Sequence, residues 1–159
     1  MGSVEKAAFK DAVSIYHLIK KYPVEVVPRS LSDITTNIDR FYVYKEGTEI
    51  LGSVSWKILP EMGKETEHIV EIVSLCVEKK AQSKGVGRIL VNSIIDHIKQ
   101  FHPTKIILLT FSPEFFAKLG FKRTSKRRLH NKLYLGCINC TKYLNPLTCP
   151  EVAMMLKMK

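Results

Sequence analysis

The chain has 159 residues, 45% of them hydrophobic and 25% charged, which is typical of one globular domain with its own core. Its 25 lysines and arginines exceed its 15 aspartates and glutamates, so the formal net charge of +10 favours an anionic partner. The chain has no apolar run of the roughly 20 residues that a membrane span needs. Four cysteines without a signal-peptide core indicate a cytoplasmic protein with free thiols.

The first 60 residues are predicted to form short strands and helices in a mixed order. The apolar periods and turn residues predict, in chain order, a strand over 3–9, helices over 10–22 and 30–37, and a hairpin of strands over 40–47 and 49–59. Asp11 is the expected N-cap of the first helix, and Ser30 or Ser32 that of the second. Gly47 supplies the turn of the hairpin.

The second half of the chain repeats a strand–helix order. Its patterns predict strands over 68–77, 105–111 and 151–158, a helix over 86–101 and a short helix over 112–121. The apolar face of the longer helix is formed by Val86, Ile89, Leu90, Ile94, Ile95 and Ile98. Residues 122–150 are basic and irregular and contain three of the cysteines. The mixed order predicts a single α+β domain, with a mixed central sheet flanked by helices.

A glycine-containing segment, "AQSKGVGRIL" at 81–90, joins the strand over 68–77 to the longer helix. Gly85 and Gly87 can turn several backbone amides toward one point, and the helix N-terminus adds a partial positive charge there. Lys84 and Arg88 add cations, so a phosphate is the expected ligand. The segment lacks the Lys-Ser/Thr of a Walker loop and the third glycine of a dinucleotide fingerprint. A tight turn without a ligand is the alternative.

In this context Q-S-K-G-V-G resembles the Q/R-x-x-G-x-G/A motif of the GNAT superfamily of acetyltransferases. The resemblance implies the GNAT (acyl-CoA N-acyltransferase) fold over residues 1–159, with acetyl-coenzyme A as co-substrate. The positions that it assigns to the pyrophosphate are Gln82, Ser83, Lys84, Gly85, Val86, Gly87 and Arg88. Further coenzyme contacts that it implies are Leu75, Cys76, Val77, Phe115 and Phe116.

Residues 28–155 resemble more closely the short, stand-alone N-acetylglutamate synthase-type proteins, through "PRSLSDI", "RFYVYKEGTEILGSV", "LLTFSPEFFAKLGF" and "CINCTKY". This implies acetylation of the α-amine of a small amino acid, above all L-glutamate, as a step of arginine biosynthesis. Arg29 and Lys132 match the cations that hold the acceptor. A surface arginine and a solvated lysine are the alternatives.

The expected mechanism is direct attack of the amine in a ternary complex. Glu71 lies in an apolar strand where a carboxylate is costly unless it is used or paired, and it matches the family's general base. A pair with a cation of a neighbouring strand is the alternative. If side chains alternate along this strand, Glu71 and Val77 share one face. The resemblance implies an oxyanion donor at the amide of Cys76 or Val77.

Two other chemical roles concern a nucleophile and a general acid. Cys76 is an unsuitable nucleophile, because a thiol among apolar side chains stays protonated. The tyrosine with which many GNAT enzymes protonate the leaving thiolate is replaced by Phe115 or Phe116. Tyr134 or Ser112 could take its place, or the thiolate could leave unassisted.

The basic segment 122–132 carries no interleaved aromatic platform, so nucleic acid is not the expected partner. Cys137, Cys140 and Cys149 have a spacing compatible with a zinc site that His130 would complete. The alternative is that they are packing residues. Two other functions stay open: a protein or peptide N-acetyltransferase, and a non-catalytic module that binds acetyl-coenzyme A. A homodimer formed through the strands is compatible with this fold size.

Overall fold

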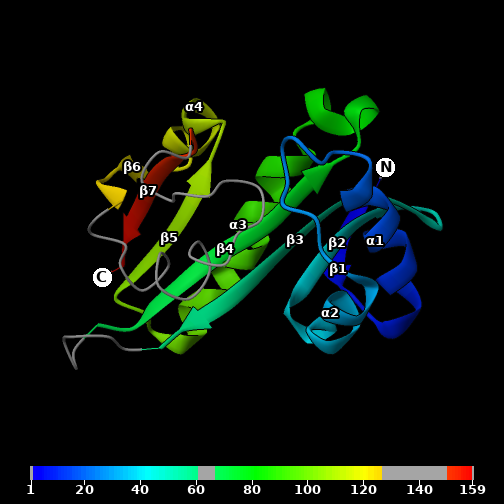
Figure 1. The fold of residues 1–159 in the computed structure, drawn as a ribbon, viewed down its shortest axis with the longest axis horizontal. Helices are drawn as coiled ribbons and strands as arrows, with labels where there is room; N and C mark the ends of the chain where they lie inside the picture. Colours follow the sequence, from blue (N-terminus) through cyan, green and yellow to red (C-terminus); the bar gives the residue numbers. More distant parts are fainter. Residues whose placement is uncertain (1, 61–66, 127–149, 159) are drawn as a thin grey trace. The chain divides into compact units, whose positions relative to one another are not determined.

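The computed structural model describes residues 2–60, 67–126 and 150–158 (Figure 1). The strands are β1 Ser3–Lys6, β2 Phe41–Glu46, β3 Glu49–Leu59, β4 Ile69–Val77, β5 Lys105–Thr110, β6 Lys122–Arg123 and β7 Val152–Lys157. The α-helices are α1 Ala12–Lys20, α2 Leu31–Thr36, α3 Val86–Ile98 and α4 Pro113–Ala117. Short 3₁₀ helices are η1 Phe9–Asp11, η2 Ile38–Arg40, η3 Lys79–Lys84 and η4 Lys99–Phe101.

The strands are hydrogen-bonded in the order β1-β2-β3-β4-β5-β7-β6. The sheet is mixed, because β4 and β5 are parallel whereas β5 and β7 are antiparallel. This confirms the predicted α+β class with a mixed sheet and flanking helices. The predicted strands and α-helices are all present, and within residues 2–60, 67–126 and 150–158 the two-residue β6 is the one strand that was missed. Its two exposed cations gave no apolar pattern to detect. The short 3₁₀ helices were not predicted as such.

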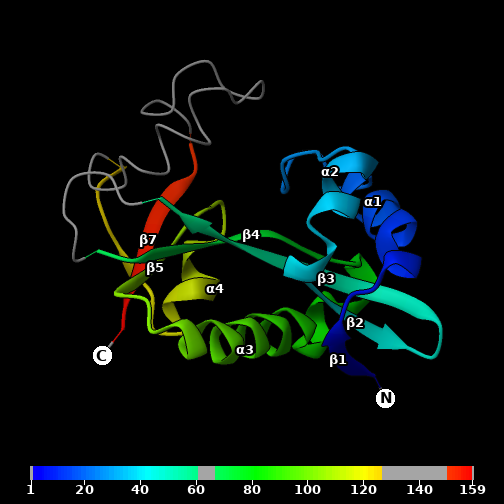
Figure 2. The same cartoon turned by 90° about the horizontal axis from the view of Figure 1, so that it is seen from below.

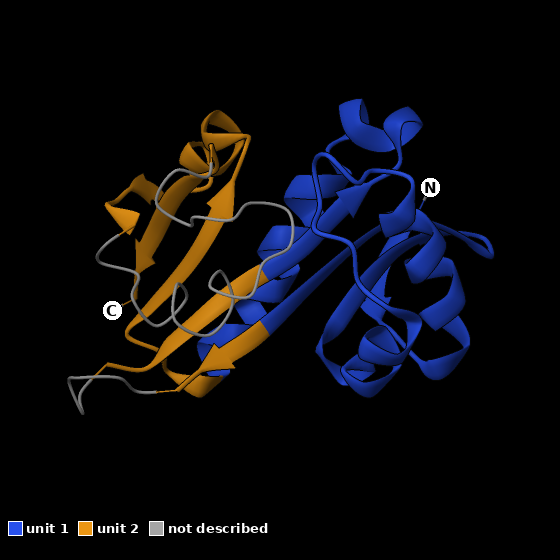
Figure 3. Cartoon of the chain, in the orientation of Figure 1, with its two compact units in different colours: residues 1–56, 73–100 blue, residues 57–72, 101–159 orange. Residues whose placement is uncertain are grey.

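The chain divides into two compact units (Figure 3). The first comprises residues 1–56 and 73–100, and the second residues 57–72 and 101–159. Strands β3 and β4 each contribute residues to both.

In the first unit, α1 and α2 lie on one face of the strands and α3 on the other (Figure 2). The core on the α1 side contains Ala12, Ile15, Leu18, Ile19, Val26, Ile34, Phe41, Val43 and Cys76. The apolar period read from residues 10–22 therefore predicted the buried face of α1.

Helix α3 packs against β3 at Gly52. A Cβ atom there would lie 2.8 Å from Leu90 Cδ1 and 3.2 Å from Val86 Cγ1, so the glycine permits a close approach of helix and strand. The predicted apolar face of α3 is wrong at one position. Ile89 is 43% exposed, and Val91 is fully buried in its place.

Asp11 precedes α1 as predicted, but its side chain does not cap that helix. Its carboxylate accepts the N–H of Ala8 at 2.8 Å and pairs with Lys45 at 2.8 Å. Burial opposes ionisation, but the hydrogen bonds from Lys45 and Ala8 outweigh it and hold the pKa of Asp11 below its usual value. Asp11 therefore anchors η1 to β2.

Trp56 lies in a cluster of aromatic and cationic side chains from η2, β2, β3 and α3. The guanidinium carbon of Arg40 is 4.5 Å from the centroid of the indole ring, within cation–π range. The imidazole of His97 is centred 5.4 Å from the indole and 5.6 Å from the Tyr42 ring. Burial, with a smaller contribution from Lys6, lowers the pKa of His97.

In the second unit, the parallel register of β4 and β5 runs from Ile69 opposite Lys105 to Glu71 opposite Ile107. Strand β7 pairs with β5 on its other side and with β6. One core cluster of this unit consists of Leu59, Ile69, Ile107 and Ala153. Among the described residues, no helix has the length and apolar character needed to cross a bilayer.

Candidate active site

The glycine turn, residues 78–88, connects β4 to α3 in the first unit. After β4 ends at Val77, η3 forms one 3₁₀ segment, and Gly85 then takes a left-handed conformation with φ of 78°. Helix α3 begins at Val86, as the sequence predicted. Only glycine adopts this conformation without strain, so Gly85 fixes the point where the chain enters the helix.

The glycine turn is held by bonds within its own segment. The side-chain amide of Gln82 donates to the carbonyl of Val77 at 3.1 Å, and the N–H of Ala81 donates to the carbonyl of Glu78 at 2.8 Å. The N–H of Glu78 donates to Leu51 on β3 at 2.8 Å. Gln82 therefore stabilises the turn through the Val77 carbonyl, a role that the sequence did not indicate.

The N-terminal end of α3 has the properties of an anion site. The amides of Val86, Gly87 and Arg88 occupy the first turn, where N–H groups have no acceptor within the helix. The side chains of Lys84 and Arg88 are exposed beside them, whereas that of Val86 is buried. The backbone of the turn and two cations can thus hold a phosphate group.

Strand β4 is distorted immediately before the turn. Ser74 has φ of 57°, so the backbone is not extended there. The assumption of regular alternation along the whole strand is therefore wrong at Ser74, and the shared face inferred for Glu71 and Val77 does not follow from it. The pairing with β5 runs from Ile69 to Glu71, and β4 continues to Val77.

The last residues of β4 differ in burial. Leu75 and Val77 are half-buried, whereas Cys76 is buried, with Sγ 3.7 Å from the carbonyl of Leu18 on α1. Burial is the main cause, and the negative charge of Glu78 the second, of the rise in the pKa of Cys76 to about 12. The thiol is accordingly protonated at neutral pH, which supports the prediction that it is not a nucleophile.

Arg29 lies in the arginine loop, residues 22–30, and its side chain is only 16% exposed. Nε donates to Asp33 Oδ2 at 2.6 Å and Nη1 donates to Ser74 Oγ at 3.2 Å. The guanidinium carbon lies 4.9 Å from the centre of the Phe41 ring. The alternative of an ordinary surface arginine is therefore wrong, because three different elements hold the guanidinium in place.

Two of these partners were missed in the sequence. Asp33 follows Arg29 at the i,i+4 spacing of helical ion pairs, and this spacing could have revealed it. Ser74 is a polar residue in an apolar strand, but its contact with Arg29 spans 45 positions and has no local signal.

Glu71 belongs to the second unit and is 1% exposed. Lys57 Nζ, on β3, lies 3.2 Å from Glu71 Oε1, and the Lys57 side chain is 41% exposed. The pair with a cation of a neighbouring strand, which the sequence left open, is thus present. It compensates a charge that would be costly to bury alone.

Helix α4 places two phenylalanines at the positions singled out in the sequence. Phe116 is 5% exposed, and its ring is centred 5.7 Å from that of Phe121, so it belongs to the core. Phe115 is half-buried and meets Phe116 edge-on at 4.9 Å. Ser112 is exposed, and its N–H donates to Thr110 Oγ1 at 2.8 Å.

Several predicted site residues lie outside the described residues: Lys132, Tyr134, Cys137, Cys140 and Cys149, together with His130. Their suggested roles in acceptor binding, proton transfer or zinc binding stay predictions. Within residues 2–60, 67–126 and 150–158, no group of His, Cys, Asp or Glu side chains is arranged to hold a metal ion.

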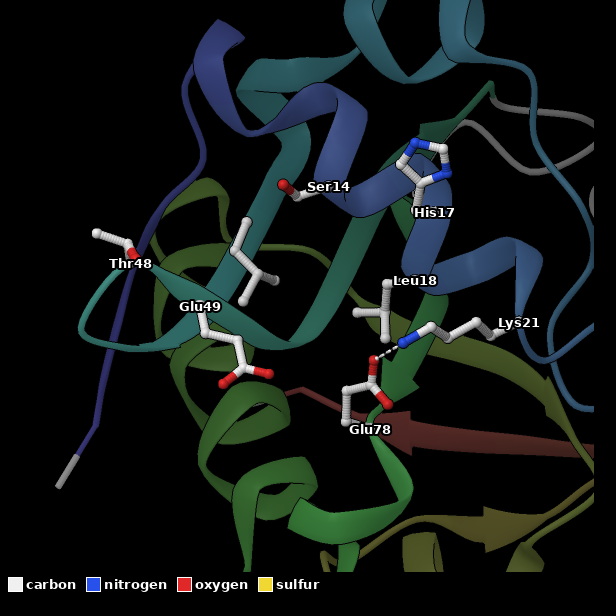
Figure 4. A pocket seen from close by; sticks show the side chains of 8 residues that line it. Ser14, His17, Leu18, Lys21, Thr48, Glu49 and Glu78 are labelled. Atoms are coloured by element: carbon white, nitrogen blue, oxygen red, sulfur yellow. Dashed lines mark hydrogen bonds and ion pairs between the residues drawn. The ribbon is translucent and has the colours of Figure 1, made fainter.

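A pocket of about 250 Å³ opens between α1, the β2–β3 turn and the end of β4 (Figure 4). Its lining residues are Ser14, His17, Leu18, Lys21, Thr48, Glu49, Ile50 and Glu78. Both carboxylates are already paired: Glu78 with Lys21 at 2.6 Å, and Glu49 with Lys80 at 2.7 Å. The pocket therefore offers no uncompensated charge to a ligand.

Comparison with known proteins gives these sites a context. Residues 12–121 match the acetyltransferase (GNAT) family. An uncharacterized N-acetyltransferase of Chlorobaculum tepidum is 27% identical over 96% of this chain and 94% of its own length. An amino-acid acetyltransferase of Photorhabdus laumondii is 29% identical over 75% of this chain but 26% of its own length.

Two solved structures share the fold. Rv2747 from Mycobacterium tuberculosis, in complex with CoA and NLQ, has a TM-score of 0.79 at 19% identity and matches over 99% of both chains. N-acetylglutamate synthase from Neisseria gonorrhoeae, complexed with coenzyme A and N-acetyl-glutamate, also has a TM-score of 0.79, at 21% identity over 100% of this chain and 35% of that chain. The likeness confirms the fold that the motif implied.

Proposed function

The chain belongs to the GNAT family of acetyltransferases, and we propose that it transfers the acetyl group of acetyl-coenzyme A to the α-amine of a small amino acid, above all L-glutamate. The observation that carries this proposal is the position of Arg29, whose guanidinium is half-buried and tied to the strand that leads into the glycine turn. A fixed, partly desolvated arginine is suited to a carboxylate.

The glycine turn is the proposed site of the coenzyme pyrophosphate. The left-handed Gly85 directs the chain so that the first amides of α3 and the side chains of Lys84 and Arg88 surround one anion. Leu75 and Val77 would contact the coenzyme next to this turn. Because the thiol of Cys76 is buried and protonated, only its backbone is available for the reaction.

The acceptor carboxylate is the proposed ligand of Arg29. An arginine has five N–H donors, and the bonds to Asp33 and Ser74 use two of them, so the others can reach a carboxylate. Asp33 compensates part of the positive charge of the Arg29 guanidinium. This favours binding of the acceptor carboxylate through hydrogen bonds over binding through charge alone. Lys132 is the proposed second cation.

In the proposed mechanism, Glu71 accepts a proton from the α-ammonium, directly or through water, and the neutral amine attacks the acetyl carbonyl carbon. The C–N bond forms as the carbonyl oxygen becomes an oxyanion, to which the amide of Val77 donates. Collapse of this intermediate breaks the C–S bond, and the coenzyme leaves as a thiolate, which takes up the proton that the nitrogen loses as the neutral amide forms. Lys57 stays beside Glu71 and compensates its buried charge.

The test is thiol release from acetyl-coenzyme A across a panel of free amino acids, for the unaltered protein, Glu71→Gln and Glu67→Gln. Glu67 is a matched control, since it also pairs with a lysine, Lys105 at 3.3 Å, and precedes the same strand. We expect saturable turnover with glutamate, a fall of at least ~100-fold for Glu71→Gln, and little change for Glu67→Gln.

Other outcomes of this experiment select a different function. Turnover with peptides but not with free amino acids would contradict the amino-acid substrate and favour a peptide N-acetyltransferase. Tight coenzyme binding without thiol release for any amine would favour the non-catalytic module. Equal losses in both variants would contradict the role of Glu71 as base.

A further inference from the structure

Tyr22 connects the arginine loop to the glycine turn. Its hydroxyl donates to Glu78 Oε2 at 3.0 Å and accepts the backbone N–H of Lys79 at 2.9 Å. These are the first two residues of the glycine turn, 56 and 57 positions away in the sequence. One hydroxyl therefore fixes both a side chain and the backbone at the point where β4 passes into η3.

Glu78 is well placed to receive this bond. Its other oxygen, Oε1, accepts from Lys21 at 2.6 Å, as Figure 4 shows, and its side chain is 17% exposed. The hydrogen bond from Lys21, opposed by burial and assisted by Tyr22, lowers the pKa of Glu78. The carboxylate is therefore charged at neutral pH, and a charged acceptor strengthens the bond from the tyrosine.

The backbone of Tyr22 starts the arginine loop. Its N–H donates to Ile19 at 3.1 Å in the last turn of α1, and its carbonyl accepts from Val26 at 3.0 Å. The loop contains no helix or strand, and Val24 and Val27 are 69% and 47% exposed. With few buried side chains in the loop, its conformation depends on a small number of tethers.

Those tethers act at three points. Tyr22 holds the start of the loop to the glycine turn, and Val26, 7% exposed, packs into the core beside α1. Arg29 holds its end through Asp33 and Ser74. Tyr22 therefore connects residues 78 and 79, through its hydroxyl, with the segment that carries Arg29, through the bond from Val26 to its carbonyl.

We propose that Tyr22 is a positioning residue that links coenzyme binding at the glycine turn to the conformation of the arginine loop. The proposal rests on the proposed function, because it takes residues 78–88 as the coenzyme site and Arg29 as the acceptor site. Binding of the coenzyme orders the turn, the hydroxyl of Tyr22 transmits that order to the loop, and Arg29 is held ready for the acceptor.

The first test measures the Kd of coenzyme A by calorimetry, without an acceptor, for the unaltered protein, Tyr22→Phe and Tyr16→Phe. Tyr16 is a matched control on α1, where its ring meets His17 edge-on. Loss of one hydroxyl that bonds a charged group should raise the Kd for Tyr22→Phe about three- to tenfold. Tyr16→Phe should bind as the unaltered protein does. Glu78→Gln, which weakens the same bond from the other side, should also raise the Kd.

The second test is hydrogen exchange with and without coenzyme A. In the unaltered protein and in Tyr16→Phe, the coenzyme should slow amide exchange both in residues 79–88 and in residues 23–30. In Tyr22→Phe, protection should persist in 79–88 and disappear in 23–30. A tyrosine that only stabilised the fold would not separate the two segments in this way.

The outcomes distinguish the positioning role from the function on which it rests. If the unaltered protein does not bind coenzyme A, the proposed function and the role of Tyr22 are both overturned. If it binds and Tyr22→Phe has the same Kd and the same protection of residues 23–30, the role alone is overturned. Loss of that protection in Tyr16→Phe as well would also overturn it, as a sign of general loosening.

Discussion

The glycine turn and the arginine loop are stabilised by contacts of different sequence range. Inside the glycine turn, Gln82 bonds to a carbonyl five positions before it, and Gly85 sets the helix start by its own backbone conformation. In the arginine loop, Arg29 depends on Ser74, 45 positions away, and on Phe41 of another strand. The part of the turn from Gln82 onward is thus specified by local sequence, whereas residues 78 and 79 and the arginine loop depend on contacts between distant parts of the chain.

This difference affects how each site should respond to substitution. A change at Gly85 alters one short segment whose other bonds persist. A change at Arg29 removes the guanidinium that contacts residues of α2, β2 and β4. Two predictions test whether the two sites respond separately, starting with the larger expected effect, and a third concerns the pH dependence of stability.

Arg29→Lys should raise the KM for the amino-acid acceptor by roughly 10- to 100-fold, because a lysine replaces charge-assisted bonds of a planar group with one point charge. The Kd of coenzyme A should change little. Arg40→Lys is the control, since Arg40 stacks on Trp56 in the same unit. An equal rise in the coenzyme Kd would show that the two sites do not respond separately.

Gly85→Ala should weaken coenzyme binding by about fivefold, because a left-handed alanine costs on the order of 1 kcal/mol. No heavy atom lies within 4 Å of the added Cβ, so backbone strain is the only new cost. Gly47 offers a control, since it is also left-handed, with φ of 61° and no atom within 4 Å. Gly47→Ala should lower the melting temperature without changing the coenzyme Kd, and an equal loss of affinity in both variants would contradict the assignment of Gly85.

The smallest expected effect concerns the pH dependence of stability. The pKa of Glu78 is lowered in the folded protein, so its contribution is complete above the ordinary value of 4.5 and is lost as the pH falls through the folded value. Glu78→Gln should therefore lower the melting temperature at pH 7 but reduce its fall between pH 5 and 3, relative to the unaltered protein. Glu49→Gln, which removes an exposed partner of Lys80, should lower the melting temperature at pH 7 by less than Glu78→Gln does, because an exposed ion pair contributes little.

The local character of the glycine turn also explains how well it was predicted. Periodicity and the two glycines located β4, the turn and α3 with the correct helix start, because these features depend on neighbouring residues. Residues 122–123 were not recognised as a strand, since a two-residue strand with exposed side chains has no pattern of its own. Ile89 was misassigned for a related reason. The helical period shows which residues share a face, but the packing of α3 against its neighbours decides which residues at the edge of that face are buried.

Prediction of the site residues was less complete for a physical reason. The burial of Glu71 followed from its apolar neighbours, but its partner Lys57 lies on another strand, and register is not readable from one sequence. The left-handed Ser74 was missed because serine carries no signal for that conformation. Tyr22 was read as the end of a helix, while its hydroxyl bonds residues more than 50 positions away.

The cluster around Trp56 has a practical consequence for measuring the unfolding of this protein. Trp56 is the single tryptophan of the chain, is 5% exposed, and lies in the first unit between Arg40 and His97. Its fluorescence therefore reports loss of the packing around Arg40 and His97 of that unit, whereas circular dichroism records the helices and strands of both units. Coincident denaturation curves from the two signals would mean that the units unfold as one cooperative body, and separated curves would assign the earlier transition to one of them.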